Sequence, residues 1–106
     1  ITDELWFCDY EFGGTPYEAP EAYERHSPHR FVENFKTPTL VVQGEQDFRC
    51  FISEGVGLFT ALQYKGVESR LLYFPNEGHW VLDPADSFVW YSEVLDWLMN
   101  HVKSEV

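Results

Sequence analysis

A strand–helix–strand–helix order runs through residues 39–102 of this sequence and favours an α/β arrangement. The segments TLVVQ at residues 39–43 and SRLLYF at residues 69–74 are short and apolar, which is typical of buried strands. Helical patterns follow them at residues 53–65 and 84–102. Because each crossover is long enough for a helix, we expect a parallel strand pair with a right-handed crossover.

Local signals predict the ends of both helices. Ser53 is expected to cap the first helix, and Gly66 to follow its last residue near Lys65. Asp83 and Pro84 are typical of the start of a helix, so the second helix is expected to begin there. That helix carries apolar residues at helical spacing: Phe88, Tyr91, Val94, Leu95, Leu98 and Val102.

The first third of the chain gives weaker signals. Residues 1–19 are aromatic and acidic, with a break at Gly13-Gly14, and we predict an irregular loop there. Residues 20–26 are expected to form a short helix, and residues 29–35 a further helical turn. For the aromatic residues of this part, packing in a core or between domains is favoured over lining a substrate pocket. These residues are Trp6, Phe7, Tyr10, Phe12 and Tyr17.

Composition excludes several classes of function. The chain has 7 basic and 18 acidic side chains and a net charge of -11, which argues against nucleic acids and anionic membranes as partners. No apolar run approaches the roughly 20 residues of a membrane-spanning helix. Cys8 and Cys50 show no framework spacing, so two free thiols are expected. His26 and His29 are separated by Pro28, and we predict neither a metal site nor a cofactor.

Two titratable residues follow the predicted strands. Asp47 comes four residues after the first strand and His79 five residues after the second. Functional groups of α/β sheets gather at the carboxyl ends of strands, so parallel strands would bring these two residues together. A carboxylate beside an imidazole can fix its tautomer and stabilise the imidazolium. Glu77, two residues before His79, is expected to be a solvated turn residue rather than a contact for a substrate amine.

An aspartate and a histidine placed together are two members of a serine-hydrolase triad. The third member, the serine, is missing, because no Gly-x-Ser-x-Gly turn occurs in the 106 residues. Two parallel strands also make a poor domain, since parallel sheets normally contain several strands and are covered on both faces. The chain is therefore expected to be the edge of a larger sheet.

Two stretches resemble the end of the catalytic domain in the prolyl oligopeptidase family, in its dipeptidyl peptidase V and acylaminoacyl-peptidase branch. TPTLVVQGEQDFR resembles that family's strand and acid loop, and SEGVGLFTALQYKGVESRLLYFPNEGHW resembles its next helix, strand and histidine loop. The upstream stretch EFGGTPYEAPEAYERHSPHRFVENFKTP is also similar to the segment that precedes the acid strand. The resemblance therefore extends over nearly the whole chain.

The resemblance implies an α/β-hydrolase fold and a role for three residues. Asp47 matches the triad acid of a G-x-x-D-x-R run, and His79 matches the triad base of a G-H pair. Arg49 matches an arginine that binds a substrate carbonyl, although a salt bridge to one of the many acids is an equal alternative. The sequence departs from the family at Cys50 and Phe51, where an apolar residue and a proline are usual, so the acid loop is expected to differ in shape.

By the same resemblance, residues 1–106 are expected to be the C-terminal part of a peptidase catalytic domain, with the nucleophile and any β-propeller upstream. The expected function is a serine exopeptidase of the dipeptidyl peptidase kind that acts on short peptides, and this part alone is expected to be inactive. Acylaminoacyl-peptidase or carboxylesterase activity is an alternative, as is a non-catalytic packing module with an exposed sheet edge. The remainder of the catalytic domain is the expected partner and a homo-oligomer is possible, with a secreted or periplasmic location slightly favoured over a cytoplasmic one.

Overall fold

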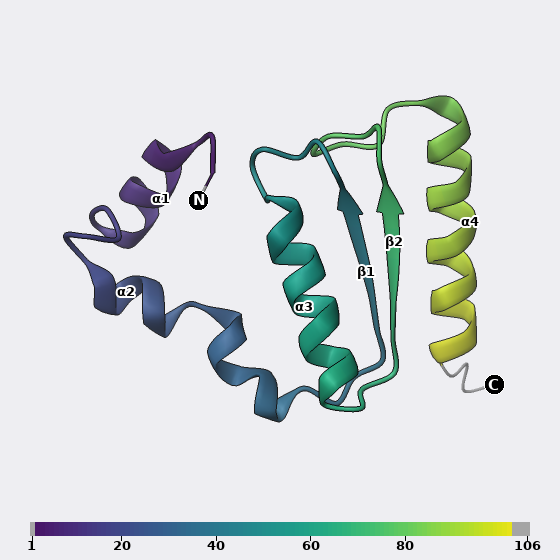
Figure 1. Cartoon of the computed structure of the whole chain (residues 1–106), viewed down its shortest axis with the longest axis horizontal. Helices are drawn as coiled ribbons and strands as arrows, with labels where there is room; N and C mark the ends of the chain where they lie inside the picture. Colours follow the sequence, from purple (N-terminus) through teal and green to yellow (C-terminus); the bar gives the residue numbers. More distant parts are fainter. Residues whose placement is uncertain (1, 103–106) are drawn as a thin grey trace.

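A parallel pair of strands, β1 (Thr39–Gly44) and β2 (Ser69–Phe74), forms the centre of the structure. The computed structural model describes residues 2–102. Helix α3 (Ile52–Tyr64) connects the strands and packs on one side of them, and α4 (Pro84–His101) lies on the other side (Figure 1). The predicted strand–helix–strand–helix order is confirmed, with each boundary within one residue of the prediction.

The register of the two strands places their carboxyl ends at one edge of the sheet. Thr39 pairs with Ser69 at one end, and Gly44 pairs with Phe74 at the other. Both strands run in the same direction, so the loops that follow them leave the sheet side by side (Figure 1). The backbone N–H of Glu45 donates to the Phe74 carbonyl at 2.9 Å and continues the pairing beyond the strands.

The buried apolar core is small. Val41, Leu62 and Phe74 are its buried apolar side chains, and Leu62 is only 1% exposed. In contrast, the apolar residues predicted on α4 are largely uncovered, with Phe88 74% and Leu95 57% exposed. An exposed apolar face of this kind is typical of a surface that contacts another part of a protein.

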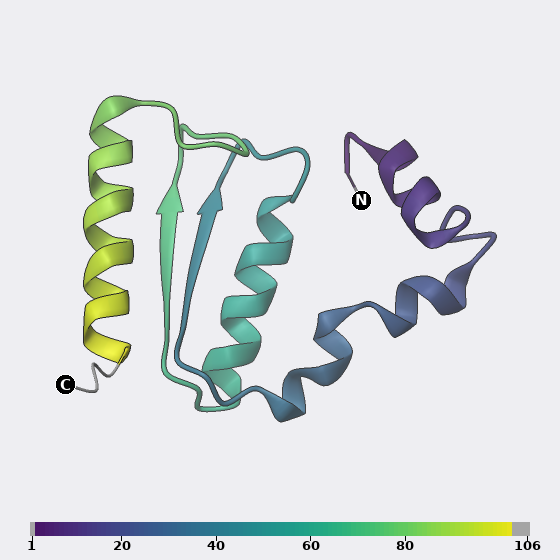
Figure 2. The ribbon, with the colours of Figure 1, turned by 180° about the vertical axis from the view of Figure 1, so that it is seen from behind.

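The N-terminal segment lies on the α3 side of the molecule, away from α4 (Figures 1 and 2). It contains α1 (Leu5–Phe12), α2 (Pro20–Arg25) and the 3₁₀ helix η1 (Pro28–Asn34). The short helix at residues 20–26 and the helical turn at residues 29–35 were thus predicted within one residue of their observed bounds.

Helix α1 corrects the prediction of an irregular loop over residues 1–19. Gly13, interpreted as part of a break, is the residue at which this helix ends in the left-handed conformation, with φ of 77°. The N–H of Gly14 then donates to the Asp9 carbonyl at 2.9 Å. Glycine adopts this backbone conformation at little cost, so the same residue ends one element and permits the turn that follows.

The aromatic residues of this part do not form a core within the described part of the chain. Trp6, Tyr10 and Tyr17 are 68%, 82% and 93% exposed. Phe12 is an exception, because its ring lies 4.6 Å from that of Tyr23. Packing of the other aromatic rings against another domain stays a prediction.

The helix starts show one confirmed cap and one wrong one. The Asp83 side chain accepts hydrogen bonds from the N–H groups of Ala85 and Asp86, as predicted for the start of α4. Ser53 does not cap α3, which begins one residue earlier and has Phe51 at the capping position with no side-chain hydrogen bond.

No helix within residues 2–102 combines the length and apolarity needed to cross a membrane.

Candidate active site

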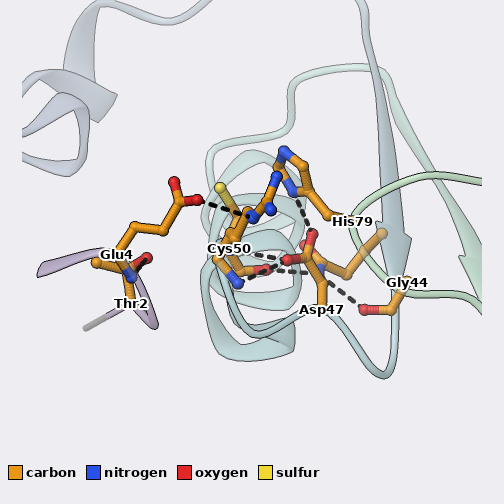
Figure 3. A network of polar contacts seen from close by, with 8 residues as sticks. Thr2, Glu4, Gly44, Asp47, Cys50 and His79 are labelled. Carbon is orange, nitrogen blue, oxygen red and sulfur yellow. Dashed lines mark hydrogen bonds and ion pairs between the residues drawn. The ribbon is translucent and has the colours of Figure 1, made fainter. Parts of the chain in front are cut away.

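Asp47 lies in the loop after β1 and is held by backbone donors. Its carboxylate Oδ1 accepts hydrogen bonds from the N–H groups of Arg49 and Cys50, both at 2.9 Å (Figure 3). The side chain therefore accepts hydrogen bonds from the backbone two and three residues later and stabilises a tight turn, as aspartate commonly does in loops. With 7% of the residue exposed, Asp47 is one of the few buried acids of the described chain.

His79 lies in the loop after β2 and contacts the second oxygen of Asp47. Its Nδ1 is 2.9 Å from Oδ2 of Asp47 (Figure 3). The predicted proximity of the two residues is confirmed, whereas their catalytic role stays a prediction. The His79 side chain is 40% exposed and that of Asp47 only 8%, so the carboxylate lies beneath an imidazole that faces outward.

Backbone contacts hold the two loops together independently of these side chains. The N–H of Gln46 donates to the Glu77 carbonyl at 3.0 Å, which joins the acid loop to the histidine loop. Gly44 allows this approach, because a Cβ at that position would lie 2.5 Å from the carbonyl oxygen of Glu77. A glycine at the end of β1 is thus a condition for the contact between Asp47 and His79.

The surroundings of Asp47 favour its charged form. Burial alone would raise the pKa of Asp47, but the hydrogen bonds from the Cys50 N–H, His79 and the Arg49 N–H together hold that pKa below its ordinary value. The carboxylate is therefore ionised at neutral pH. It can keep the Nδ1 proton of His79 in place and stabilise the positive charge that the ring acquires when Nε2 takes up a proton.

The guanidinium of Arg49 pairs with an acid of the N-terminal segment, although its backbone N–H donates to Asp47. Its Nε lies 3.3 Å from Oε1 of Glu4, which connects the acid loop to the N-terminal segment. The alternative of a salt bridge is therefore observed in this chain. Arg49 also lines a cavity of about 610 Å³ together with Phe48, His79 and Trp80. Its role in binding a substrate carbonyl stays a prediction.

No serine hydroxyl is hydrogen-bonded to His79 among residues 2–102. Ser87 lines a second cavity of about 440 Å³ with Asp47 and His79, but its Oγ donates to the Val81 carbonyl at 3.1 Å. A hydroxyl engaged in this way does not offer its proton to the imidazole. The described residues therefore place an acid and a base together without a nucleophile.

Cys50 takes part in the acid loop through its backbone. Besides the N–H that donates to Asp47, its carbonyl accepts a hydrogen bond from the Gln43 side chain at 2.9 Å. Cys8 and Cys50 are free thiols, as predicted, and burial raises the pKa of the Cys50 thiol. Whether Cys50 and Phe51 reshape this loop relative to the family stays a prediction.

Near the candidate site, the sequence prediction was wrong about Glu77. The structure buries it to 4% exposure, so it is not a solvated turn residue. Its carboxylate accepts hydrogen bonds from the N–H groups of Leu82 and Asp83, at 2.8 and 3.0 Å. An acid at the strand end followed closely by Gly78 was the only sequence signal for this arrangement, and a surface turn gives the same signal.

The sequence matches the prolyl oligopeptidase family over residues 1–105. The chain belongs to the prolyl oligopeptidase family. It is 47% identical over 102 residues to dipeptidyl-peptidase 5 of Schizosaccharomyces pombe, covering 96% of this chain and 15% of that protein. It is 50% identical over 99 residues to dipeptidyl-peptidase 5 of Arthroderma otae, covering 92% of this chain and 14% of that protein.

The family's fold is also seen in a solved structure that resembles this chain. The uncomplexed acylaminoacyl peptidase of Pyrococcus horikoshii superposes with a TM-score of 0.86 at 21% identity, covering 99% of this chain and 18% of that one. The predicted α/β-hydrolase fold is thereby confirmed. The chain spans about a seventh of the length of its curated prolyl oligopeptidase relatives, 15% and 14% for the two named above.

Proposed function

We propose that this chain supplies the acid and the base of a serine exopeptidase that acts on short peptides. The observation that carries the proposal is the 2.9 Å contact between Nδ1 of His79 and Oδ2 of Asp47, at the carboxyl ends of two parallel strands. The order of acid and histidine along the chain agrees with the order of an α/β-hydrolase after an earlier serine.

In this proposal residues 1–106 are the C-terminal part of a longer catalytic domain. The small share of each relative that the chain matches, 15% for the Schizosaccharomyces pombe protein, supports a nucleophile that lies elsewhere. The serine and the oxyanion hole would come from the upstream part, and any β-propeller would also lie there. The chain alone would then be inactive, because two triad members without a nucleophile cannot form an acyl-enzyme.

The mechanism assigns one task to each residue. Nε2 of His79 removes the proton of the serine hydroxyl as the oxygen attacks the peptide carbonyl carbon. The resulting imidazolium is stabilised by the Asp47 carboxylate, whose pKa lies below its ordinary value although burial opposes this. His79 then passes the proton to the leaving amine, and water hydrolyses the acyl-enzyme by the same exchange in reverse.

The names of the relatives favour release of dipeptides, because both curated proteins named above are dipeptidyl-peptidases 5. The test compares three substrates on the full-length protein: a dipeptidyl amide with a free N-terminus, an N-acyl aminoacyl amide, and a short-chain ester. The proposal expects the highest kcat/KM on the dipeptidyl amide. A higher kcat/KM on one of the other two substrates would make that substrate the proposed class instead. A His79→Ala variant with full activity would overturn the catalytic role itself.

A further inference from the structure

A second buried carboxylate lies in the loop that carries His79. Glu77 is 4% exposed, and its two oxygens are used separately. Oε2 accepts a hydrogen bond from the N–H of Leu82 at 2.8 Å, and Oε1 accepts one from the N–H of Asp83 at 3.0 Å. His79 lies in the sequence between Glu77 and the two donor residues. The hydrogen bonds of the Glu77 side chain therefore join the two ends of the loop segment that contains His79.

The main chain of Glu77 is joined to the acid loop. Its carbonyl accepts the hydrogen bond from the Gln46 N–H at 3.0 Å, and Gln46 directly precedes Asp47. Glu77 thus has one contact toward the acid loop and two toward the start of α4. A displacement of this residue would change the position of His79 relative to Asp47.

The charge of Glu77 suits this arrangement. The hydrogen bond from the Leu82 N–H is the largest influence that lowers the pKa of Glu77, and it outweighs burial with the help of the Asp83 N–H. Burial raises the pKa of Asp86, in the first turn of α4, and a hydrogen bond to Glu77 adds to this rise. Glu77 is therefore a charged acceptor for two backbone donors, and hydrogen bonds to a charged group are stronger than those between neutral groups.

We propose that Glu77 is a positioning residue for the base of the reaction, fixing the loop so that the His79 imidazole stays in line with Asp47. The inference rests on the proposed function, since Glu77 can position a catalytic base only if His79 is that base. It assigns no chemistry to Glu77 itself. It deepens that function by adding a carboxylate that acts through the position of His79.

The kinetic test uses a Glu77→Gln variant of the full-length protein. Glutamine keeps the size of the side chain and one acceptor oxygen, but it replaces the other oxygen with an amide that cannot accept from a backbone N–H. We expect kcat to fall about 10- to 100-fold on the dipeptidyl amide with KM within about twofold, because a small misplacement of a catalytic group lowers the rate to this extent. A Glu77→Leu variant, which accepts neither hydrogen bond, should lose more.

The matched control is Glu21→Gln, the same change at an exposed position in the first turn of α2. This variant should retain the kinetics of the unmodified protein. Thermal unfolding of the Glu77 variants identifies those that are folded at the assay temperature, and only these are compared.

A spectroscopic test separates positioning from general stabilisation. The Nδ1 proton shared by His79 and Asp47 should give a strongly downfield proton resonance, which Asp47→Ala removes. In folded Glu77→Gln protein we expect this resonance to shift or broaden, whereas Glu21→Gln leaves it in place. An unchanged resonance with unchanged kcat would overturn the positioning role.

The outcomes also separate this inference from the proposed function. If His79→Ala keeps its activity, the proposed function fails whatever Glu77 does. If His79→Ala is inactive while folded Glu77→Gln matches the unmodified protein in kcat and in the downfield resonance, the proposed function stands and the positioning role of Glu77 is wrong.

Discussion

Asp47 and His79 lie 32 positions apart in the sequence, yet Oδ2 of Asp47 is 2.9 Å from Nδ1 of His79. The register of the two parallel strands explains this contact. Gly44 pairs with Phe74 at the last position of the ladder, and each titratable residue follows its strand by a short loop. The geometry of the acid–base pair is therefore a consequence of sheet topology as well as of the two side chains.

Asp47→Asn should nearly abolish activity in the full-length protein while leaving it folded. The asparagine oxygen can still accept from the N–H groups of Arg49 and Cys50, but the neutral amide favours the wrong tautomer of His79 and cannot stabilise an imidazolium. We expect kcat/KM to fall about 10⁴-fold. Asp96→Asn, the same change at an exposed position of α4, is the control. Activity within tenfold of the unmodified protein would contradict the role of Asp47.

Gly44→Ala should separate the acid loop from the histidine loop. The added Cβ would clash with the carbonyl oxygen of Gly78 and lie 2.5 Å from that of Glu77. Overpacking of this kind costs about 1–3 kcal/mol, so we expect a lower thermal midpoint together with reduced activity. Gly57→Ala is the control, since its Cβ would meet nothing within 4 Å and alanine favours the helix. Equal midpoints for the two variants would show that the close approach at Gly44 has no structural importance.

The two predicted helix caps can be told apart by alanine substitution. Asp83 accepts hydrogen bonds from the N–H groups of Ala85 and Asp86, at 2.9 and 3.3 Å, so Asp83→Ala should lower the free energy of unfolding by about 1 kcal/mol. Ser53→Ala should change it little, because the Ser53 side chain caps nothing. Thermal or denaturant unfolding of both variants checks this difference, and a larger effect at Ser53 would be the opposite of the expected result.

His101, at the end of α4, should titrate above its ordinary pKa of 6.5. The hydrogen bond to Glu68 is the main cause of the rise, followed by the contact of its Nδ1 with the Trp97 carbonyl. The contact therefore stabilises the folded chain below about pH 6.5 and is lost as the pH rises through the raised pKa of His101. Glu68→Gln should lower that pKa.

The measurement for His101 is the ¹³C shift of its imidazole as a function of pH, assigned with a His101→Gln variant. Glu93→Gln is the control, because Glu93 lies on the same helix but pairs with Arg70 at 2.7 Å. A titration midpoint of His101 that does not respond to Glu68→Gln would mean that the contact does not set its pKa.

Strong local signals made the central elements predictable from the sequence. The apolar runs at residues 39–43 and 69–74, and the Asp83-Pro84 pair, each specify their structure through neighbouring residues alone. The proximity of Asp47 to His79 then followed from a general property of parallel strands. Helix α1 was missed because its apolar and acidic residues show no clear helical period, and Gly13 indicates a helix end as readily as a break.

The burial of Glu77 was not predictable from the sequence. A carboxylate is buried only where donors surround it, and those of Glu77 are backbone N–H groups five and six residues later in the chain. Their direction depends on how the loop folds back onto α4. The same reasoning applies to Ser53, since the preference of a serine for a cap does not fix the residue at which the helix begins.

Labelling of the full-length protein with a fluorophosphonate, which reacts with activated serines, tests the central claim most directly. The labelling rate is measured for the unmodified protein and for His79→Ala, and the labelled peptide is identified by mass spectrometry. We predict labelling of a serine outside residues 1–106, at a rate at least about 10³-fold lower in His79→Ala. Equal rates in the two proteins, or a labelled serine within residues 1–106, would contradict the assignment of His79 and Asp47 as the base and acid of a triad whose nucleophile lies upstream.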